Sequence, residues 1–440
     1  MIELLALSAL PFLVQPISAE RNPDAKPNVI LFVADDLGYG ELGCYGGKEI
    51  PTPNIDSIAK NGVRLTDGYV SCPVCAPTRA GLMTGRYGPR FGFEFNPGPQ
   101  QQASSEFGLP KSEKTIAERL KALGYATGMV GKWHLGYDKA LTPPNRGFDS
   151  FFGFLGGAHA YQGNRRGGSI VRGGERVSEP MYLTYAFGRE ATGFIDANKN
   201  RPFFLYLPFN AVHAPLQAPA RLEDRMKPYK DAKRRTFAGM LMAMDDVVGD
   251  VLASLKKAAL DKDTLVVFIA DNGGPTPQTT SSNVPLRGFK AQTWEGGIRI
   301  PYMFQWPGHL PAGGTYSKPA ISLDITPTVL AAIGSPAPSS EKLDGVNLLP
   351  YLSAQKRGLP HEALYWRFGP QNAIRMGDWK LVTANGASNA LFNLKDDISE
   401  KNDLSQKEPG RVKALKLAWE KWSGQLMRAK WGGRGKDKED

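Results

Sequence analysis

Four continuous apolar runs divide the chain into an alternating α/β pattern, over residues 29–34, 125–130, 203–207 and 265–270. Runs of this length without alternating polar residues are typical of strands buried on both faces, as in a parallel or mixed sheet between helices. Charged residues or potential metal ligands follow each run. Because α/β sheets bind ligands at the carboxyl ends of their strands, the pattern predicts one site built from four strand ends.

Helices are predicted between and after these runs from the spacing of apolar residues. Residues 115–123 carry apolar side chains on one face and are followed by a glycine, which can end a helix. Residues 237–255 repeat apolar side chains every three or four positions, so a long core-facing helix is expected there. A further helix is predicted to begin at Thr326-Pro327 and to end at Gly334.

The C-terminal part has a different pattern. A loop rich in Ser and Pro, residues 335–340, is followed by short predicted strands and a helix, over residues 363–368, 373–376, 379–383 and 412–422. We therefore predict an α/β fold with a large mixed, mostly parallel sheet sandwiched by helices, and a smaller C-terminal α+β domain. The expected boundaries are 20–349 for the catalytic domain and 350–440 for the C-terminal domain with its charged tail.

Length and composition fit an exported enzyme. A chain of 440 residues suits two domains. Residues 1–19 hold an apolar stretch from Leu4 to Val14 and end in the small residues Ser18-Ala19, which predicts a secretory signal peptide and a periplasmic or secreted protein. We expect no membrane span, because no other apolar run is long enough. The net charge of +11 favours anionic partners such as polysaccharide sulfates, and no nucleic-acid motif of the usual kinds is present.

The stretch Cys75-Ala-Pro-Thr-Arg-Ala-Gly-Leu-Met-Thr-Gly85 predicts a helix that begins at a thiol. Pro77 suits the first helical turn, and Gly85 can end the helix. A cysteine at a helix N-terminus lies in a positive backbone field, which activates its reacting group. Arg79 follows four residues later on the same face, so its guanidinium can reach Cys75 or an anion beside it.

Cys72 and Cys75 also form a C-x-x-C pair, which occurs in thioredoxin-like redox sites and in zinc knuckles. Cys44 is the only other cysteine, so a second pair of zinc ligands is missing. A thiol redox or zinc protein is therefore the weakest of the readings.

Two pairs of oxygen ligands follow two of the predicted strands. Asp35-Asp36 comes after residues 29–34, and Asp271-Asn272 comes after residues 265–270. Either pair alone is an ordinary turn or helix cap. Two carboxylate-rich pairs at one sheet edge suit a hard divalent cation, with Ca²⁺ favoured over Mg²⁺ where protein oxygens dominate.

Residues 75–85 resemble the signature of the formylglycine-dependent sulfatases, type I enzymes of the alkaline-phosphatase-like superfamily. Their pattern is Cys-x-Pro-x-Arg followed by Ala/Ser-x-Leu-Leu/Met-Thr-Gly, and every position is matched. The resemblance extends to Gly131-Lys-Trp-His134, to Val212-His-Ala-Pro215 and to the surroundings of Lys290. It implies that a maturation enzyme oxidises Cys75 to formylglycine. It also implies one bound Ca²⁺, whose ligands would be Asp35, Asp36, Asp271, Asn272 and the oxygen of residue 75.

The resemblance further implies a sulfuric ester hydrolase that works through a sulfo-enzyme intermediate. The implied catalytic residues are Cys75, Arg79, Lys132, His134, His213 and Lys290. Arg79, Lys132 and Lys290 would neutralise the sulfate oxygens. His213, assisted by Lys290, would protonate the leaving oxygen, and His134 would help to release sulfate.

Substrate contacts are expected from Lys132, His213 and Lys290, with His159 and Arg165 as weaker candidates in a glycine-rich loop. Residues 285–299 and 238–249 resemble the arylsulfatase B type, whereas residues 86–97 resemble bacterial sulfatases of marine galactans. Both resemblances imply a substrate with a sulfate ester on a galactose or N-acetylgalactosamine unit of a polysaccharide, and O4 is one candidate for the sulfated oxygen. Two alternatives stay open: a phosphoester or phosphonate hydrolase of the same fold, and a catalytically silent carbohydrate-binding protein.

Overall fold

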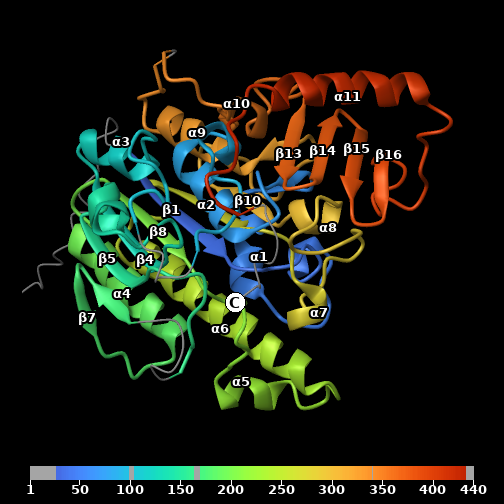
Figure 1. Cartoon of the computed structure of the whole chain (residues 1–440). Coiled ribbons are helices and arrows are strands. Elements are labelled where there is room, and N and C mark those ends of the chain that lie inside the picture. Colours follow the sequence, from blue (N-terminus) through green and yellow to red (C-terminus); the bar gives the residue numbers. More distant parts are fainter. Residues whose placement is uncertain (1–25, 99–103, 163–168, 339, 433–440) are drawn as a thin grey trace, which may run out of the picture.

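The computed structural model describes residues 26–98, 104–162, 169–338 and 340–432 (Figure 1). The predicted signal peptide, residues 1–19, lies outside the described residues. Within the described ranges, no helix is both long enough and apolar enough to cross a membrane.

The predicted strands form the centre of a ten-stranded sheet. Neighbouring parallel strands run in the order β9 (Thr264–Ala270), β1 (Asn28–Ala34), β8 (Phe203–Pro208), β4 (Ala126–Lys132) and β5 (Ser150–Phe154). The four runs are thus confirmed as buried parallel strands. Strand β4 is longer than expected, so Lys132 ends the strand instead of following it.

Shorter strands extend the sheet at both edges. They are β10 (Tyr302–Gln305), β2 (Val63–Leu65) and β11 (Gly314–Tyr316) beyond β9, and β6 (Ile170–Arg172) and β7 (Glu175–Val177) beyond β5. Strand β10 is antiparallel to β9, and β6 is antiparallel to β5. The sheet is therefore mixed at its edges and parallel at its centre, as predicted.

Helices cover both faces of this sheet (Figure 1). One face carries α1 (Pro53–Lys60), α4 (Leu183–Asn198) and α6 (Ala232–Lys257), and the other carries α2 (Cys75–Thr84), α3 (Ile116–Ala122) and α9 (Ile325–Ala332). The three helices predicted from spacing are α3, α6 and α9. Thr115 begins α3 with a capping box, in which its side chain and that of Glu118 bond each other's backbone N–H groups. Short helices complete the set: α5 (Ala220–Arg225), α7 (Thr276–Thr279), α8 (Glu295–Ile298) and α10 (Leu349–Leu352).

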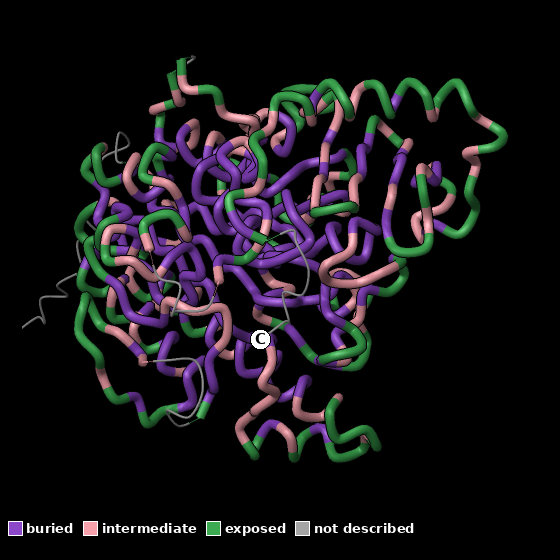
Figure 2. Tube along the Cα trace, in the orientation of Figure 1, coloured by how far each residue is buried: buried purple, intermediate pink, exposed green. Residues whose placement is uncertain are grey.

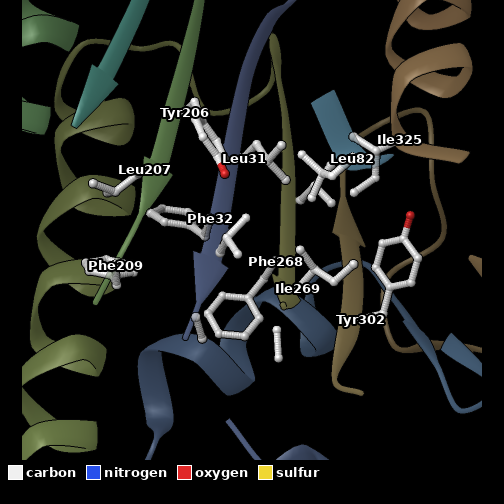
Figure 3. Packing of buried hydrophobic residues seen from close by; sticks show 14 of the residues in the cluster. Leu31, Phe32, Leu82, Tyr206, Leu207, Phe209, Phe268, Ile269, Tyr302 and Ile325 are labelled. Carbon is white, nitrogen blue, oxygen red and sulfur yellow. The ribbon is translucent and has the colours of Figure 1, made fainter. Parts of the chain in front are cut away.

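The hydrophobic core lies along the central strands. Leu31 and Phe32 of β1 pack beside Phe268 and Ile269 of β9, while Leu82 of α2 approaches from the helical layer (Figure 3). Buried residues fill the middle of the molecule and exposed residues lie at its periphery (Figure 2). This rigid centre fixes the strand ends that follow it.

A second, four-stranded antiparallel sheet follows near the C-terminus. It contains β13 (Leu364–Phe368), β14 (Gln371–Met376), β15 (Trp379–Ala384) and β16 (Ala387–Asn393), and α11 (Pro409–Ser423) packs on it. Three of these strands and the helix were predicted. Strand β16 was missed because its first half is polar and only partly buried, so it lacks an apolar run.

Candidate active site

The two pairs of acidic and amide residues meet at the carboxyl edge of the central sheet. Ala34 of β1 and Ala270 of β9 are register partners in parallel strands, so the residues that follow them lie side by side. Asp36 N–H donates to Asp271 Oδ1 at 3.2 Å, and Asn272 Nδ2 donates to Asp36 Oδ1 at 2.7 Å. Asp35, Asp36, Asp271 and Asn272 are all fully buried. The predicted convergence of these four residues is present.

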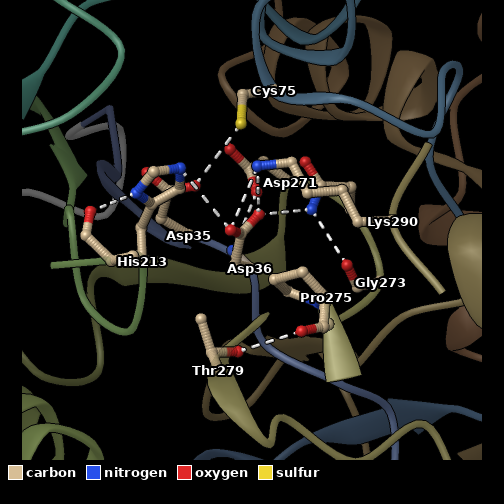
Figure 4. Close-up of polar contacts among 12 residues, drawn as sticks. Asp35, Asp36, Cys75, His213, Asp271, Gly273, Pro275, Thr279 and Lys290 are labelled. Atoms are coloured by element: carbon tan, nitrogen blue, oxygen red, sulfur yellow. Dashed lines mark hydrogen bonds and ion pairs between the residues drawn. The ribbon is translucent and has the colours of Figure 1, made fainter. Parts of the chain in front are cut away.

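Cys75 begins α2, as the sequence predicts, and Gly85 ends this helix with a φ of 71°. The sulfur of Cys75 lies 3.5 Å from Asp35 Oδ1 (Figure 4). Asn96, an exposed residue, accepts a hydrogen bond from Ala76 N–H at 3.1 Å. No periodic pattern predicts this contact, because Asn96 lies in an irregular segment.

The unmodified thiol is not activated by its place at the helix N-terminus. Burial raises the pKa of Cys75 well above its usual value, although Lys132 and Lys290 act to lower it. The expectation of an activated thiol is therefore wrong for the cysteine form: at neutral pH the sulfur keeps its proton. The buried, protonated thiol is a poor nucleophile.

Arg79 reaches the anions beside Cys75 instead of the thiol. Its Nε and Nη2 donate to Asp271 Oδ2 at 2.9 and 2.8 Å, and Nη1 donates to the carbonyl oxygen of Lys132 at 3.1 Å. Its Nη2 also lies 3.6 Å from Asp35 Oδ2. Arg79 thus ties α2 to the ends of β1, β4 and β9, which holds the edge of the sheet together.

Two lysines complete the charge balance. Lys132 Nζ donates to Asp35 Oδ2 at 2.5 Å, and Lys290 Nζ lies 3.0 and 3.1 Å from the two carboxylate oxygens of Asp36 (Figure 4). Burial alone would raise the pKa of Asp36, but Lys290 and other neighbours lower it to about 2. The site therefore pairs three buried carboxylates with three buried or nearly buried cations.

The two predicted histidines border this charge network. His213 Nε2 lies 3.6 Å from Asp36 Oδ2, and its Nδ1 lies 2.6 Å from the carbonyl oxygen of Ala214. Burial lowers the pKa of His213 to about 4, and Lys290 and Lys132 add to this lowering while Asp36 opposes it. An anion bound beside His213 would raise this pKa again, because it would favour the charged imidazolium.

His134 lies deeper in the site. Burial holds the pKa of His134 well below its usual value, and the positive charges of Lys132, Arg79 and Lys290 lower it further. Its Nδ1 has no hydrogen-bond partner within the part of the chain that the structure describes. Gly157 faces the ring: a Cβ there would lie 2.8 Å from Nε2, so only glycine leaves room for His134.

His159 is buried beside residues 210–213 and does not line an open entrance to the site. Its residue is 2% exposed, its ring packs 5.1 Å from that of Phe154, and its carbonyl oxygen accepts from Asn210 Nδ2 at 3.3 Å. Tyr161, two residues on, donates its hydroxyl toward the carbonyl oxygens of Asn210 and His213 at 2.5 and 2.9 Å. Substrate contact by His159 stays a prediction, and Arg165 lies outside the described residues.

The donor set fits a divalent cation. Asp35, Asp36, Cys75 and His213 each offer one ligand atom, and these atoms lie within 4.8 Å of one another. Two ligands of one Ca²⁺ at about 2.3–2.6 Å can be up to ~5 Å apart, so this spacing is compatible with a shared ion. Asn272 Oδ1 is buried and lacks a hydrogen-bond partner among the described residues, as expected of an oxygen meant for a cation. Cys72 is not part of this group, which disfavours a C-x-x-C metal site.

Replacing Arg79 by Met is expected to destabilise the fold. The change leaves Asp271 and Asp35 buried beside each other with one cation fewer, and breaking such a buried pair costs about 3–5 kcal/mol. Urea denaturation measures this loss. Lys416→Ala is the control: its pairing with Glu420 is half exposed, with side chains 53% and 50% accessible, so a loss below about 0.5 kcal/mol is expected. A similar midpoint for Arg79→Met and the wild type would contradict this view of Arg79.

The parallel sheet edge with buried carboxylates, lysines and histidines around a helix N-terminus suits an enzyme that acts on anionic esters, and the structural relatives place the fold in the alkaline-phosphatase-like class. The family model described as Sulfatase matches residues 27–335, so the chain belongs to the sulfatase family. It is a sulfatase, an enzyme that hydrolyses sulfate esters. Enzymes of this family generally use a formylglycine and a Ca²⁺ ion, and the buried cluster is a possible metal-binding site.

Known relatives agree with this assignment. Arylsulfatase A of Homo sapiens is 37% identical over 388 residues, which cover 80% of this chain and 74% of the relative. N-acetylgalactosamine-6-sulfatase of Sus scrofa is 33% identical over 377 residues, 80% of this chain and 71% of the relative. The crystal structure of Ps i-CgsB in complex with k-i-k-neocarrahexaose superposes with a TM-score of 0.88 at 38% identity, covering 93% of this chain and 95% of that one.

Proposed function

We propose that this sulfatase removes sulfate from a galactose or N-acetylgalactosamine unit of a sulfated polysaccharide, with Cys75 oxidised to formylglycine and one Ca²⁺ bound. The observation that supports the proposal most is the buried convergence of Asp35, Asp36, Asp271 and Asn272 beside Cys75. A cation held there and an oxidised residue 75 would share one small pocket.

Asp35, Asp36, Asp271 and Asn272 would hold the metal together with the oxygen of residue 75. When bound, Ca²⁺ supplies Lewis acidity and a template for the sulfate oxygens, and the hydrated aldehyde supplies two hydroxyl groups on one carbon. With a cation held there, Asp35 and Asp36 would depend less on Lys132 and Lys290 as counter-charges. The two ammonium groups would then be available for sulfate oxygens.

The chain's own residues then handle charge and protons. Lys132 pairs with Asp35, and Lys290 pairs with Asp36. Both ammonium groups can stabilise the charge that builds on sulfate during transfer. His213 is 11% exposed at its side chain and lies beside Asp36, which suits a donor of a proton to the leaving oxygen. His134 is the base candidate for sulfate release, because burial and nearby cations keep its imidazole neutral.

The substrate class is inferred from two observations. The net charge of +11 favours a polyanion. The structural relative Ps i-CgsB binds k-i-k-neocarrahexaose, and one sequence relative is an N-acetylgalactosamine-6-sulfatase. We therefore propose a sulfated galactan of the carrageenan kind as the first substrate to test, with sulfated galactosaminoglycans second. The sulfated position, including O4, is open to the same test.

A sulfate ester should be hydrolysed at least about 100-fold more efficiently, in kcat/KM, than the phosphate ester of the same alcohol. The phosphate dianion brings one more negative charge beside the carboxylates of Asp35 and Asp36, without a further cation to balance it. Parallel assays of 4-nitrophenyl sulfate and 4-nitrophenyl phosphate measure the ratio. Faster phosphate hydrolysis would favour the phosphoester or phosphonate alternative. Loss of both activities in enzyme that carries formylglycine would favour a binding protein.

Sulfate release from defined oligosaccharides, measured by ion chromatography, then ranks neocarra-oligosaccharides against galactosaminoglycan fragments. We also propose that the protein is periplasmic or secreted and that a formylglycine-generating enzyme is its maturation partner. We further propose that the boundary between the catalytic and C-terminal domains lies at residues 349/350. The separate four-stranded sheet supports that division.

A further inference from the structure

Lys290 lies on a loop whose backbone is fixed from outside the large sheet. We call residues 285–295 the Lys290 loop. Ala291, directly after the lysine, has a φ of 66°, in the left-handed region. This conformation costs a residue with a Cβ about 1–2 kcal/mol, so surrounding contacts have to maintain it. One such contact is from Ala291 N–H to the carbonyl oxygen of Pro73, at 2.9 Å, two residues before Cys75.

The second contact comes from Gln371, the first residue of β14 in the C-terminal sheet. Its Nε2 donates to the carbonyl oxygen of Ala291 at 2.8 Å, and its Oε1 accepts from Thr293 N–H at 3.2 Å. Both ends of one side-chain amide therefore hold the Lys290 loop, on either side of Gln292. A side chain that uses its donor and its acceptor on one short segment fixes both the position and the orientation of that segment.

Other contacts between the C-terminal sheet and this loop lie farther from the lysine. Thr293 Oγ1 donates to the carbonyl oxygen of Thr383 at 3.3 Å. Lys380 Nζ bridges Glu295 and Glu400 at 2.9 Å each, all three side chains being fully buried. These contacts anchor the far end of the loop. Among the contacts from the C-terminal sheet to this loop, the hydrogen bond of Gln371 to Ala291 is the nearest to Lys290 along the chain.

We propose that Gln371 is a positioning residue for sulfate hydrolysis. It holds the backbone after Lys290 and so keeps the ammonium group at the edge of the sheet, where Nζ lies 3.0 and 3.1 Å from the two carboxylate oxygens of Asp36 and from where it would reach a bound sulfate. Gln371 itself contacts backbone atoms of the loop and acts through the lysine. The inference rests on the proposed function, in which Lys290 contacts sulfate, and it makes the C-terminal sheet part of the catalytic assembly.

The test is a double-mutant cycle between Gln371 and Lys290, measured as kcat/KM for an aryl sulfate on enzyme of known formylglycine content. Q371M keeps the side-chain length and removes both hydrogen bonds. In the wild-type background, Q371M is expected to lower kcat/KM about tenfold, because small displacements of a sulfate ligand are costly. In the Lys290→Ala background, the same change is expected to cost less than twofold, since the residue it positions is gone.

If Gln371 had a merely structural role, Q371M would lower activity by the same factor in both backgrounds. That result would overturn the inference, and so would full activity of Q371M.

Q371E is the second variant: it keeps the acceptor for Thr293 N–H, loses the donor to Ala291 and should show the same coupling if Q371M folds poorly. Asn372→Ala is the matched control, because neighbouring residues of a strand point to opposite faces. Normal activity of Lys290→Ala would instead contradict the proposed role of Lys290 itself.

Discussion

Cys75→Ser should abolish steady turnover, with a loss in kcat of at least about 10⁴-fold, the scale seen when a nucleophile is removed. A serine hydroxyl at the start of α2 occupies the same place beside Asp35 and can still accept the sulfo group from the ester oxygen. It has no second hydroxyl on the same carbon, so it cannot expel sulfate again. The expected product is one sulfate ester per enzyme molecule, detected as a mass gain of about 80 Da.

Cys72→Ser is the matched control for this experiment. Cys72 is also buried and lies three residues away, and its sulfur lies 3.9 Å from the carbonyl oxygen of Glu94, in a weak hydrogen bond. A serine there keeps a donor for the same carbonyl, so activity is expected to stay within a few fold of the wild type. Multiple turnover by pure Cys75→Ser enzyme would refute the role assigned to residue 75.

Asp36→Asn is expected to lower both the affinity for Ca²⁺ and kcat/KM by about 100-fold or more. Asparagine has the shape of aspartate but lacks its charge, and Asp36 is the carboxylate that Lys290, His213 and Asn272 all approach. Calcium content after dialysis, followed by calcium titration of the activity, measures both quantities. Excess calcium should restore part of the activity, because the fold of the site is retained.

Asp245→Asn controls for the loss of a buried carboxylate as such. Asp245 accepts the backbone N–H groups of Asn54 and Ile55 at the start of α1 and belongs to a different part of the protein. We expect unchanged calcium binding in this variant. Calcium binding by Asp36→Asn with wild-type affinity would show that the ion binds elsewhere.

The central sheet and the convergence of the acidic residues at its edge could be predicted because their signals are strong and local. The apolar runs before Asp35 and Asp271 are fully buried strands, and parallel strands bring their carboxyl ends to one edge. Cys75 and Arg79 share one helix, so their spacing alone placed them together. These parts of the site depend on regular elements whose geometry follows from the sequence pattern.

The remaining parts of the site depend on tertiary contacts without a periodic signal. Asn96 acts from an irregular segment and Gln371 from the start of β14, each on backbone groups of another part of the chain. The glycine-rich segment around His159 suggested an open loop, yet His159 is buried beside residues 210–213. Gly157 is needed there because the His134 ring occupies the space that a Cβ would fill. Short edge strands such as β10 were missed because three or four residues carry too little pattern.

The most direct test of the account is the mass of the tryptic peptide 65–79 from active enzyme, together with specific activity. Conversion of Cys75 to formylglycine lowers this mass by about 18 Da, because sulfur leaves as H₂S and one oxygen is gained. We predict that preparations with different fractions of the lighter peptide show proportional activity, which extrapolates to zero at zero conversion. Full sulfatase activity in a preparation whose peptide carries only the unmodified thiol would contradict the account.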